Sequence, residues 1–265
     1  MTDPNLEDLP STPWGVSAAY LYLLDLDDSA LAWEYLRRHP GYRLDWKRRK
    51  RVVSFARWGL RYCEDPDLDG RLAHPLWRSS PDGLLQVRAA HARSAVTRRF
   101  DLWRISGRKR LALDGSDLSL TTDLSAQRMH LSLSGSLADG TPYAGAVPLT
   151  RNLRGNLGTF IAQAQALEGH PPQVDPARAV SRGALLHLRA LQALDAAQVG
   201  ASQRDIAQVL FGLEAVVLRW HEDGELRAQV RHLLRRAEAL MNGGYLTLAG
   251  VSHPATNHPG DEPVR

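Results

Sequence analysis

Three arginines near the C-terminal end of the chain repeat at a spacing that suits binding to a polyanion. Arg227, Arg231 and Arg235 lie four residues apart, so on a helix they share one side. His232 and Arg236 flank them. Apolar residues recur at three- and four-residue spacing on another side: Leu226, Val230, Leu233, Leu234, Ala237, Leu240 and Met241. The pattern predicts a helix that packs by one face and presents guanidinium groups by another.

A second, shorter helix is predicted just before it. Ser202 is a good N-cap, Asp205 stands at the third helical position, and the pair Phe211-Gly212 ends the helix. The residues from Leu213 to Gly224, with a packing Trp220 among them, are expected to form an unusually long turn. Two helices with a turn between them, and arginines on the second, are what a DNA-reading helix-turn-helix needs.

A third helix is predicted over Ser181 to Ala197, and it completes a small trihelical core. Its expected buried positions are Leu185, Leu186, Leu188, Leu191 and Leu194. A competing interpretation of the arginine row is a solvated surface, which is the commoner role of arginines on a helix face. Acidic residues between positions 178 and 242 offset most of the arginines there, so composition alone does not establish DNA binding.

Two segments of the chain resemble a known family of regulators. ASQRDIAQVLFG and, after the Trp-containing turn, LRAQVRHLLRRAEALMNGGY resemble an extended-turn helix-turn-helix domain of proteobacterial mobile elements. WGVSAAYLYLLDLDDSALAWEYLRRHPGYRLDW, followed by RWGLRYCEDPDL, resembles the domain that accompanies it in FseA-type activators of integrative and conjugative element excision and transfer. QseM-type antiactivators carry only the helix-turn-helix part, so the order of the two segments favours the activator class.

The resemblance implies two functional surfaces. One positive face of the C-terminal domain would contact DNA, through Ser202, Gln203, Arg204, Arg227, Arg231, Arg235 and Arg236. The opposite face would dock on the N-terminal domain through Tyr20, Leu21, Tyr22, Leu23 and Leu24, and an antiactivator would compete for that surface. Taken without the resemblance, the segment from Tyr20 to Leu24 is an ordinary amphipathic helix in a local core.

The composition agrees with an intracellular regulator. The chain of 265 residues carries a net charge of +4 with a pI of about 9.4, which suits a polyanionic partner without being diagnostic. One cysteine, Cys63, excludes a disulfide framework within the chain. There is no long apolar run, and the polar start MTDPNLEDLP does not resemble a signal peptide. We therefore expect a cytoplasmic, nucleoid-associated protein without a membrane partner.

Periodicity divides the chain into regions and predicts an α+β, mainly helical fold. The expected parts are a mobile lead-in (1–13), an N-terminal helical interaction domain (14–83), a β-rich segment (84–147), a C-terminal extended-turn helix-turn-helix domain (148–250) and a disordered tail (251–265). In the first domain, Asp28 or Ser29 is expected to cap one helix, His39-Pro40-Gly41 to break it, and Asp45 to cap a longer helix reaching Leu60. Four tryptophans there are expected mostly in the core: Trp14, Trp33, Trp46 and Trp58.

Alternating apolar and polar residues predict strands in the middle region. The clearest are 86–88, 100–105 and 129–133, with turn signals at 114–115 and 139–140. This is also the most basic part of the chain, with clusters at 98–99 and 108–110. Two interpretations stay open for the clusters: they clamp DNA phosphates, or they are a solvated hairpin edge protected by charge. The basic run 47–51 is open in the same way, between a DNA or polymerase contact and a solvated helix face.

Residue patterns for catalysis and metal binding are weak. The segment from Asp65 to Gly70 imitates the start of a calcium loop, but the twelfth position is Leu76 rather than Glu. No HExxH, GK[ST] or Gly-x-Ser-x-Gly motif occurs. The expectation is therefore no catalytic site, no metal and no cofactor.

The function expected from the sequence is a sequence-specific, DNA-binding transcriptional activator that controls transfer genes of a mobile element. Its partners would be double-stranded promoter DNA, an antiactivator protein and RNA polymerase. Two alternatives stay open. One is an antiactivator or interaction regulator that does not bind DNA, and the other is a DNA-architectural factor that bends recombination sites.

Overall fold

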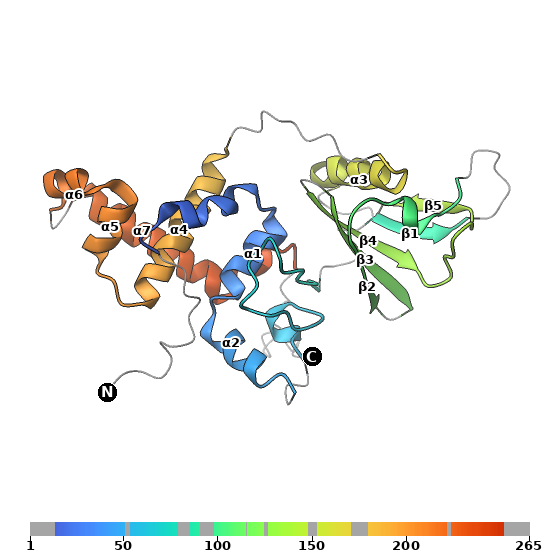
Figure 1. The fold of residues 1–265 in the computed structure, drawn as a ribbon, viewed down its shortest axis with the longest axis horizontal. Coiled ribbons are helices and arrows are strands. Elements are labelled where there is room, and N and C mark those ends of the chain that lie inside the picture. The colour runs from blue at the N-terminus through green and yellow to red at the C-terminus, as the bar shows by residue number, and fades with distance from the viewer. Residues whose placement is uncertain are drawn as a thin grey trace, which may run out of the picture. The chain divides into compact units, whose positions relative to one another are not determined.

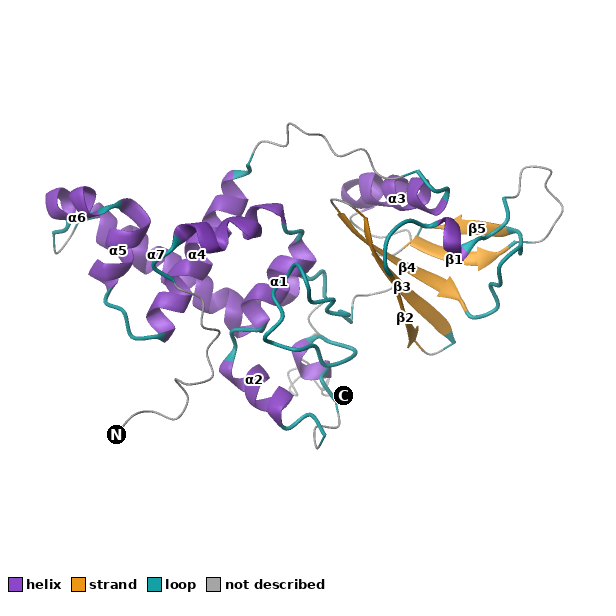
Figure 2. Cartoon of the chain, in the orientation of Figure 1, coloured by secondary structure: helices purple, strands orange, loops and turns teal. Residues whose placement is uncertain are grey.

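The computed structural model describes residues 14–50, 54–78, 85–90, 98–114, 116–124, 127–147, 153–170, 180–221 and 224–251. The chain forms two compact units (Figure 1). The helical unit combines Met1–Arg78 with Val180–Arg265, and the sheet unit comprises Ser79–Ala179. The strands belong to the sheet unit and most helices to the other (Figure 2). The α+β, mainly helical fold predicted from the sequence is thereby confirmed. The expected lead-in and nearly all of the expected tail lie outside the described residues.

The N-terminal part of the helical unit is a series of short helices. They are the 3-10 helix η2 (Ser17–Asp25), α1 (Asp28–Leu36), α2 (Pro40–Lys47) and the 3-10 turn η3 (Ala56–Trp58). The Asp27 side chain caps α1 by accepting a hydrogen bond from the amide of Ala30 at 2.7 Å, so the predicted cap was one residue late. A cap before the first helical residue leaves the carboxylate free to reach the unpaired amides of the first turn.

The predicted long helix starting at Asp45 was wrong. Helix α2 begins at Pro40, with His39 as its N-cap, and ends at Lys47. Proline suits this first position because its fixed φ is already helical and its missing N–H would be unpaired there in any case. Asp45 instead accepts a hydrogen bond from the Trp58 indole at 2.8 Å and pairs with Arg57, which ties the end of α2 to η3.

The C-terminal part of the helical unit is a helical bundle. Its elements are α4 (Arg182–Gln198), α5 (Gln203–Phe211), α6 (Leu213–Arg219), α7 (Glu225–Ala239), the π-turn η6 (Leu240–Gly244) and α8 (Tyr245–Leu248). The predicted N-cap Ser202 is confirmed, since its side chain accepts a hydrogen bond from the Asp205 amide. Ser181, where the third helix was predicted to begin, caps α4 by accepting a hydrogen bond from the Ala184 amide. Gly212 ends α5 with a φ of 90°, in the left-handed half of backbone space where glycine is favoured.

The segment predicted as one long turn contains a helix. Helix α6 (Leu213–Arg219) directly follows Gly212, and Trp220 is its C-cap. The sequence LEAVVLR contains neither Gly nor Pro, so helical propensity operates as soon as the glycine has reversed the chain. Val216 is fully buried, whereas Leu213, Val217 and Leu218 are each more than 60 % exposed. Because most of its apolar side chains face solvent, α6 has no single apolar face, and apolar periodicity therefore did not identify the helix.

The core of the helical unit draws residues from both halves of the chain. Trp33, Tyr35 and Leu191 are fully buried, and the predicted buried face of α7 is confirmed at Leu226, Val230, Leu233, Ala237 and Met241. Of the four tryptophans expected in the core, only Trp33 is buried, and Trp14, Trp46 and Trp58 are half-buried. Leu185 is 40 % exposed, contrary to the prediction. The first turn of α4 is therefore largely exposed, whereas from His187 to Ala196 nearly every residue of the helix is buried.

The sheet unit is a mixed sheet with one helix on it. The described strands run in the order β2-β3-β4-β1-β5, with β1 and β4 parallel and the other neighbours antiparallel. Their bounds are β1 (Leu85–Ala89), β2 (Lys109–Asp114), β3 (Asp117–Leu124), β4 (Gln127–Ser134) and β5 (Tyr143–Ala146), and helix α3 spans Leu153–Leu167. Phe160 and Leu167 of α3 share a core with Leu131 and Val87 of the sheet. Helix α3, predicted in the C-terminal domain, thus belongs to the same compact unit as the strands.

Two of the three predicted strands of this region are found, as β1 and β4. The third, over 100–105, was wrong, because the 3-10 turn η5 (Leu102–Arg104) occupies it. Asp101 accepts a hydrogen bond from the Trp103 amide at 2.9 Å and Asp139 accepts one from the Leu102 amide at 2.9 Å. Side-chain acceptors therefore take the amides that a strand would have paired. Asp114 of β2 pairs with Asp117 of β3, on either side of the turn predicted at 114–115, whose Gly115 lies outside the described residues.

Candidate nucleic-acid interface

The arginine row lies on the outer side of α7. Arg231 and Arg235 are exposed and Arg227 is half-buried, while the apolar residues of the same helix are in the core. At 1.5 Å of rise per residue the row extends over about 12 Å, close to the width of the major groove of B-DNA, roughly 12 Å. Each four-residue step also turns about 40° further round the axis, so the row follows a shallow spiral. This geometry allows neighbouring guanidinium groups to reach one groove.

Arg236 does not belong to this row. It follows Arg235 directly and so points about 100° away from it round the axis of α7. Its side chain is half-buried, and its Nε is buried without a hydrogen-bond partner among the described residues. Burial raises the pKa of Tyr35 and the charge of Arg236 partly opposes that rise, whereas burial and Arg236 together lower the pKa of His187. The structure therefore places Arg236 toward α1 and α4, and separates it from the other arginines that the sequence grouped with it.

The start of α5 presents a different picture. Gln203 is half-buried and Arg204 is exposed. Ser202 forms a capping box with Asp205: its amide donates to the Asp205 carboxylate at 3.2 Å, and its hydroxyl donates to the same oxygen at 2.7 Å. Helix N-termini attract phosphates because of their unpaired amides, but here a carboxylate already occupies that end. Arg204 is consequently the residue at this helix start best suited to a DNA contact.

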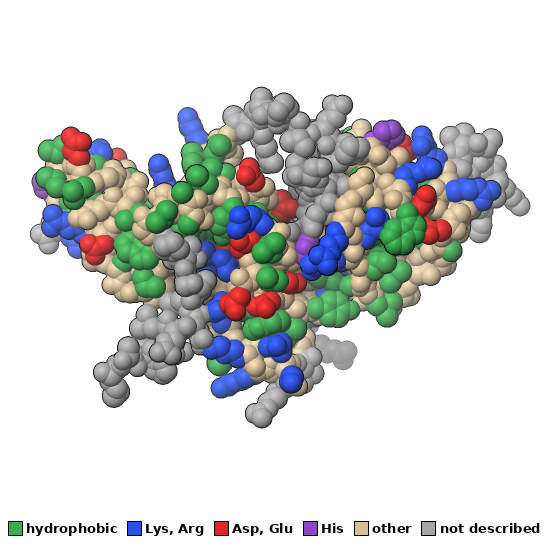
Figure 3. Space-filling view, viewed as in Figure 1, with side chains coloured by type: hydrophobic (Ala, Val, Ile, Leu, Met, Phe, Trp, Pro, Cys, Tyr) green, Lys and Arg blue, Asp and Glu red, His purple; other side chains and the backbone are tan. Residues whose placement is uncertain are grey.

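Basic side chains are spread widely over the face shown in Figure 3, among acidic and apolar ones. The basic clusters of the sheet unit likewise lie among acidic and apolar side chains. Arg98 lies 3.2 Å from Glu168, and Arg99 donates to the carbonyl of Gly140 at 2.8 Å. Lys109 and Arg110 lie on β2, an edge strand of the sheet, with Lys109 over the ring of Trp103 at 5.5 Å. This arrangement favours the protected-edge interpretation of the clusters over a phosphate clamp.

The predicted docking segment packs against α4. Tyr20 and Leu23 of η2 are fully buried, Leu21 is 53 % exposed, and Tyr22 and Leu24 are half-buried. The Tyr20 hydroxyl donates to the Asp195 carboxylate of α4 at 2.7 Å. Desolvation and the neighbouring carboxylate raise the pKa of Tyr20 well above its usual range, so the hydroxyl keeps its proton. The segment thus contacts a helix that lies 175 residues further along the chain.

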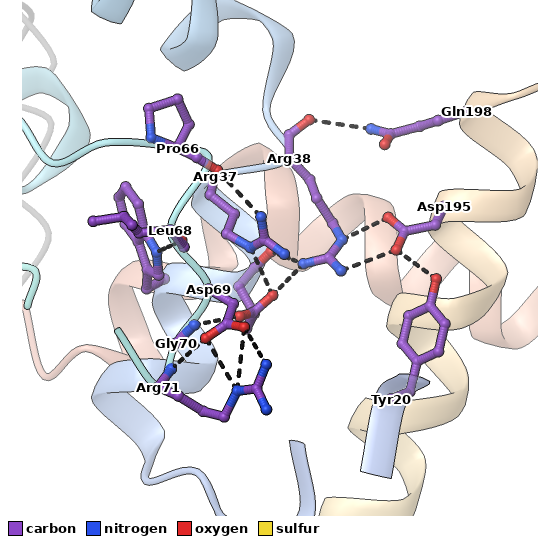
Figure 4. Close-up of polar contacts among 12 residues, drawn as sticks. Tyr20, Arg37, Arg38, Pro66, Leu68, Asp69, Gly70, Arg71, Asp195 and Gln198 are labelled. Carbon is purple, nitrogen blue, oxygen red and sulfur yellow. Dashed lines mark hydrogen bonds and ion pairs between the residues drawn. The ribbon is translucent and has the colours of Figure 1, made fainter. Parts of the chain in front are cut away.

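Asp195 belongs to a buried charge cluster that the sequence analysis did not identify. The guanidinium of Arg38 is fully buried and donates to both carboxylate oxygens of Asp195, at 2.6 and 2.9 Å (Figure 4). It also donates to Glu34, which accepts a further bond from Arg37 at 2.8 Å. The two arginines outweigh desolvation and lower the pKa of Glu34. Two cations therefore face two anions, which is how proteins keep charges buried.

The charge cluster joins the N-terminal segment to α4. Glu34 lies in the last turn of α1, Arg38 follows the C-cap of that helix, and Asp195 lies in the last turn of α4. Gln198 strengthens the same junction by donating from its side chain to the carbonyl of Arg38 at 3.1 Å. The signal in the sequence was the pair Arg37-Arg38, which directly follows the largely apolar run from Ala30 to Leu36. Its partner could not be identified because nothing in the local pattern points 157 residues ahead.

Comparison with protein-family models gives two matches. Residues 146–249 match a family described as a type VI secretion system (T6SS) transcription factor, DNA-binding domain. Residues 13–63 match a proteobacterial transcriptional regulator-like domain. These matches support a DNA-binding transcription regulator. Each covers less than half of the chain, and a search of curated proteins gives no match. The first match contains the arginine row and α5, and the second contains Tyr20, Glu34 and Arg38.

The described residues offer little for other kinds of site. No group of three or more His, Cys, Asp or Glu among them is arranged to hold a metal ion. Asp67 and Asp69, from the segment that imitates a calcium loop, pair with Arg43 and Arg71. Among the described residues, no helix has the length and apolar character needed to cross a membrane.

Proposed function

We propose that this protein is a sequence-specific transcriptional activator whose C-terminal helices bind promoter DNA. The observation that carries the proposal is the row of half-buried Arg227 and exposed Arg231 and Arg235 on the outer side of α7, within the segment matched by a DNA-binding domain. Arginine pairs bidentately with guanine in the major groove and also binds phosphates. The row therefore supplies both sequence discrimination and backbone affinity.

The target genes and the direction of regulation are the finer part of the proposal. The resemblance of both segments to FseA-type activators supports control of excision and transfer genes of a mobile element, in the cytoplasm, by binding rather than by catalysis. Activation would need a contact with RNA polymerase. The basic end of α2 is exposed at Lys47, Arg48 and Arg49, and it is the candidate for that contact within the regulator-like domain.

The docking of η2 on α4 supplies the proposed control of this activity. An antiactivator that took the place of the Tyr20 to Leu24 segment would have to replace the buried hydroxyl bond to Asp195. Such a partner would separate the two matched domains without contacting the arginine row. DNA binding and activation would then respond differently to it.

A gel-shift titration against DNA upstream of the neighbouring transfer genes tests the DNA-binding part of the proposal. We expect a complex that survives excess nonspecific competitor and that weakens when Arg231 and Arg235 are replaced by Gln. Arg88→Gln removes one exposed positive charge on β1 and is the matched control. No complex, or one that competitor abolishes, would contradict sequence-specific binding and favour a regulator that acts on another protein.

In vitro transcription from the same promoter separates an activator from an architectural factor. An activator raises the yield of transcript with purified RNA polymerase. A factor that binds and bends recombination sites would bind DNA with the same dependence on Arg231 and Arg235 and leave the transcript yield unchanged, which would contradict the activator assignment.

A further inference from the structure

A groove of about 660 Å³ opens between α4, α5 and α7. Its apolar lining comes from all three helices: Leu185 and Leu186 of α4, Phe211 of α5 and Leu233 of α7. Leu233 is buried, whereas Leu185 is 40 % exposed and Leu186 and Phe211 are half-buried. The volume lies within the range of small-molecule sites, roughly 300 to 1,000 Å³. Leu185, which the sequence predicted in the core, lines this groove instead.

Two arginines of α4 line the same groove. Arg182 and Arg189 are seven residues apart, so they lie on the same side of α4, about two turns from each other. Both are exposed, and no carboxylate among the described residues pairs with either. The guanidinium of Arg189 lies 5.9 Å from the centroid of the Phe211 ring. An apolar surface and available guanidinium groups thus occur side by side.

The α7 side of the groove has a different character. Glu225 and Gln229 line it, and the Glu225 carboxylate accepts a hydrogen bond from the Gln229 side chain at 2.9 Å. His232 lies one turn further on the same side. The positive charge of the groove is therefore concentrated on α4, and the single carboxylate lies on α7. A bound anion would be oriented with its charge toward α4.

We propose that this groove binds a small carboxylate with an apolar body, and that this ligand regulates DNA binding. Arginine forks match the two oxygens of a carboxylate, and the leucines and Phe211 would cover the apolar part. The regulatory half of this inference rests on the proposed function. A ligand there would contact α4, α5 and α7 together, so it would stabilise one spacing of the helices that carry Arg204 and the arginine row.

The ligand and DNA would occupy different surfaces. On α7 the groove is lined by His232, Gln229 and Ala228, whereas the middle of the arginine row, Arg231, points about 100° away from His232 and about 60° away from Ala228 round the axis. The two molecules would therefore bind at the same time. Any effect of the ligand on DNA affinity must then arise from a coupling free energy between two sites, and it must be reciprocal.

The test is calorimetric titration of the full-length protein with octanoate, without DNA, and with 1-octanol as the neutral counterpart. We expect one octanoate per chain and much weaker binding of 1-octanol. The double variant Arg182→Gln/Arg189→Gln should bind octanoate about tenfold or more weakly. Ala228→Trp, at a solvent-exposed position that lines the groove, should block binding without changing any charge. Arg88→Gln, at an exposed position on β1, should bind as the unmodified protein does.

A lack of octanoate binding, equal binding of 1-octanol, or unchanged affinity in the arginine double variant would overturn the assignment of the groove. The gel shift is then repeated with saturating octanoate, and a change in DNA affinity that Ala228→Trp removes is expected. Octanoate binding without such a change would refute the regulatory half alone. A failed gel shift without ligand would refute the proposed function and leave the calorimetric result standing.

Discussion

Replacing Asp195 by Asn gives the sharpest test of the buried charge cluster. In the folded protein the Asp195 carboxylate accepts two hydrogen bonds from the fully buried Arg38 and one from Tyr20. Asparagine preserves the shape of the side chain but removes its charge. Arg37 and Arg38 would then face Glu34 alone, which leaves a net positive charge in the interior. Removing one partner of a buried pair typically costs about 3 to 5 kcal/mol.

The matched control is Asp67→Asn, the same chemical change in an ion pair at the surface. Asp67 lies 2.8 Å from Arg43, but its side chain is 73 % exposed. Water screens such a pair, so the free energy of unfolding should change by about 1 kcal/mol or less. Comparing the two variants removes the effect of the amide itself, and the difference measures what burial adds to the ion pair.

Urea unfolding followed by circular dichroism at 222 nm reports mainly on the helical unit. With a slope of about 1 to 3 kcal/mol per M of urea, Asp195→Asn should lower the midpoint by about 1 M or more, and Asp67→Asn by a few tenths of that. Equal shifts for the two variants would refute the reasoning. The double variant Arg38→Met/Asp195→Leu should recover much of the loss, because apolar side chains need no charge partner.

Three further outcomes are expected. Arg231→Gln or Arg235→Gln should weaken operator binding by about 1 to 3 kcal/mol in a gel shift if the side chain reads a base, and a lower salt dependence with unchanged specificity would indicate a phosphate contact instead. The free energy of unfolding of the helical unit should fall as the pH drops below 6.5. Burial and Arg236 lower the pKa of His187 in the folded protein, so the unfolded chain takes up the proton more readily. His187→Gln should flatten the pH dependence of stability in this range. Ser202→Ala should cost about 1 kcal/mol of unfolding free energy through the lost cap, and a midpoint equal to that of the unmodified protein would show that the Asp205 carboxylate caps α5 alone.

The local features of the fold were predictable from the sequence because they depend on neighbouring residues. The cap at Ser202, the stop at Gly212 and the buried face of α7 all follow from the residues of a single helix. Helix α6 was missed because its apolar side chains face solvent, and the strand over 100–105 was wrong because two aspartates bind its backbone. In both segments the side chains face solvent or bind the backbone instead of packing in the core.

The candidate interface was predictable only in part, because local spacing describes one helix and not the contacts between distant segments. The row from Arg227 to Arg235 follows directly from helical periodicity. Arg236 was grouped with it by sequence proximity, although a single residue step moves the side chain to another face of the helix. The contact of Tyr20 with Asp195, the Arg38 cluster and the groove between α4 and α7 depend on segments brought together from distant parts of the chain, which no local pattern describes.

The helical unit is built from one segment that precedes the sheet unit in the sequence and one that follows it. This order has a consequence for folding during synthesis. Asp195, the partner of Arg38, is synthesised 157 residues after it. At roughly 5 to 20 residues per second of translation, that delay is about 10 to 30 s. During this interval the aromatic side chains around Trp33 and the charges of α1 are without the helix that covers them. The ribosome therefore releases a regulator whose first domain acquires its native partner late, and nascent-chain proteolysis should show α1 protected only after α4 has emerged.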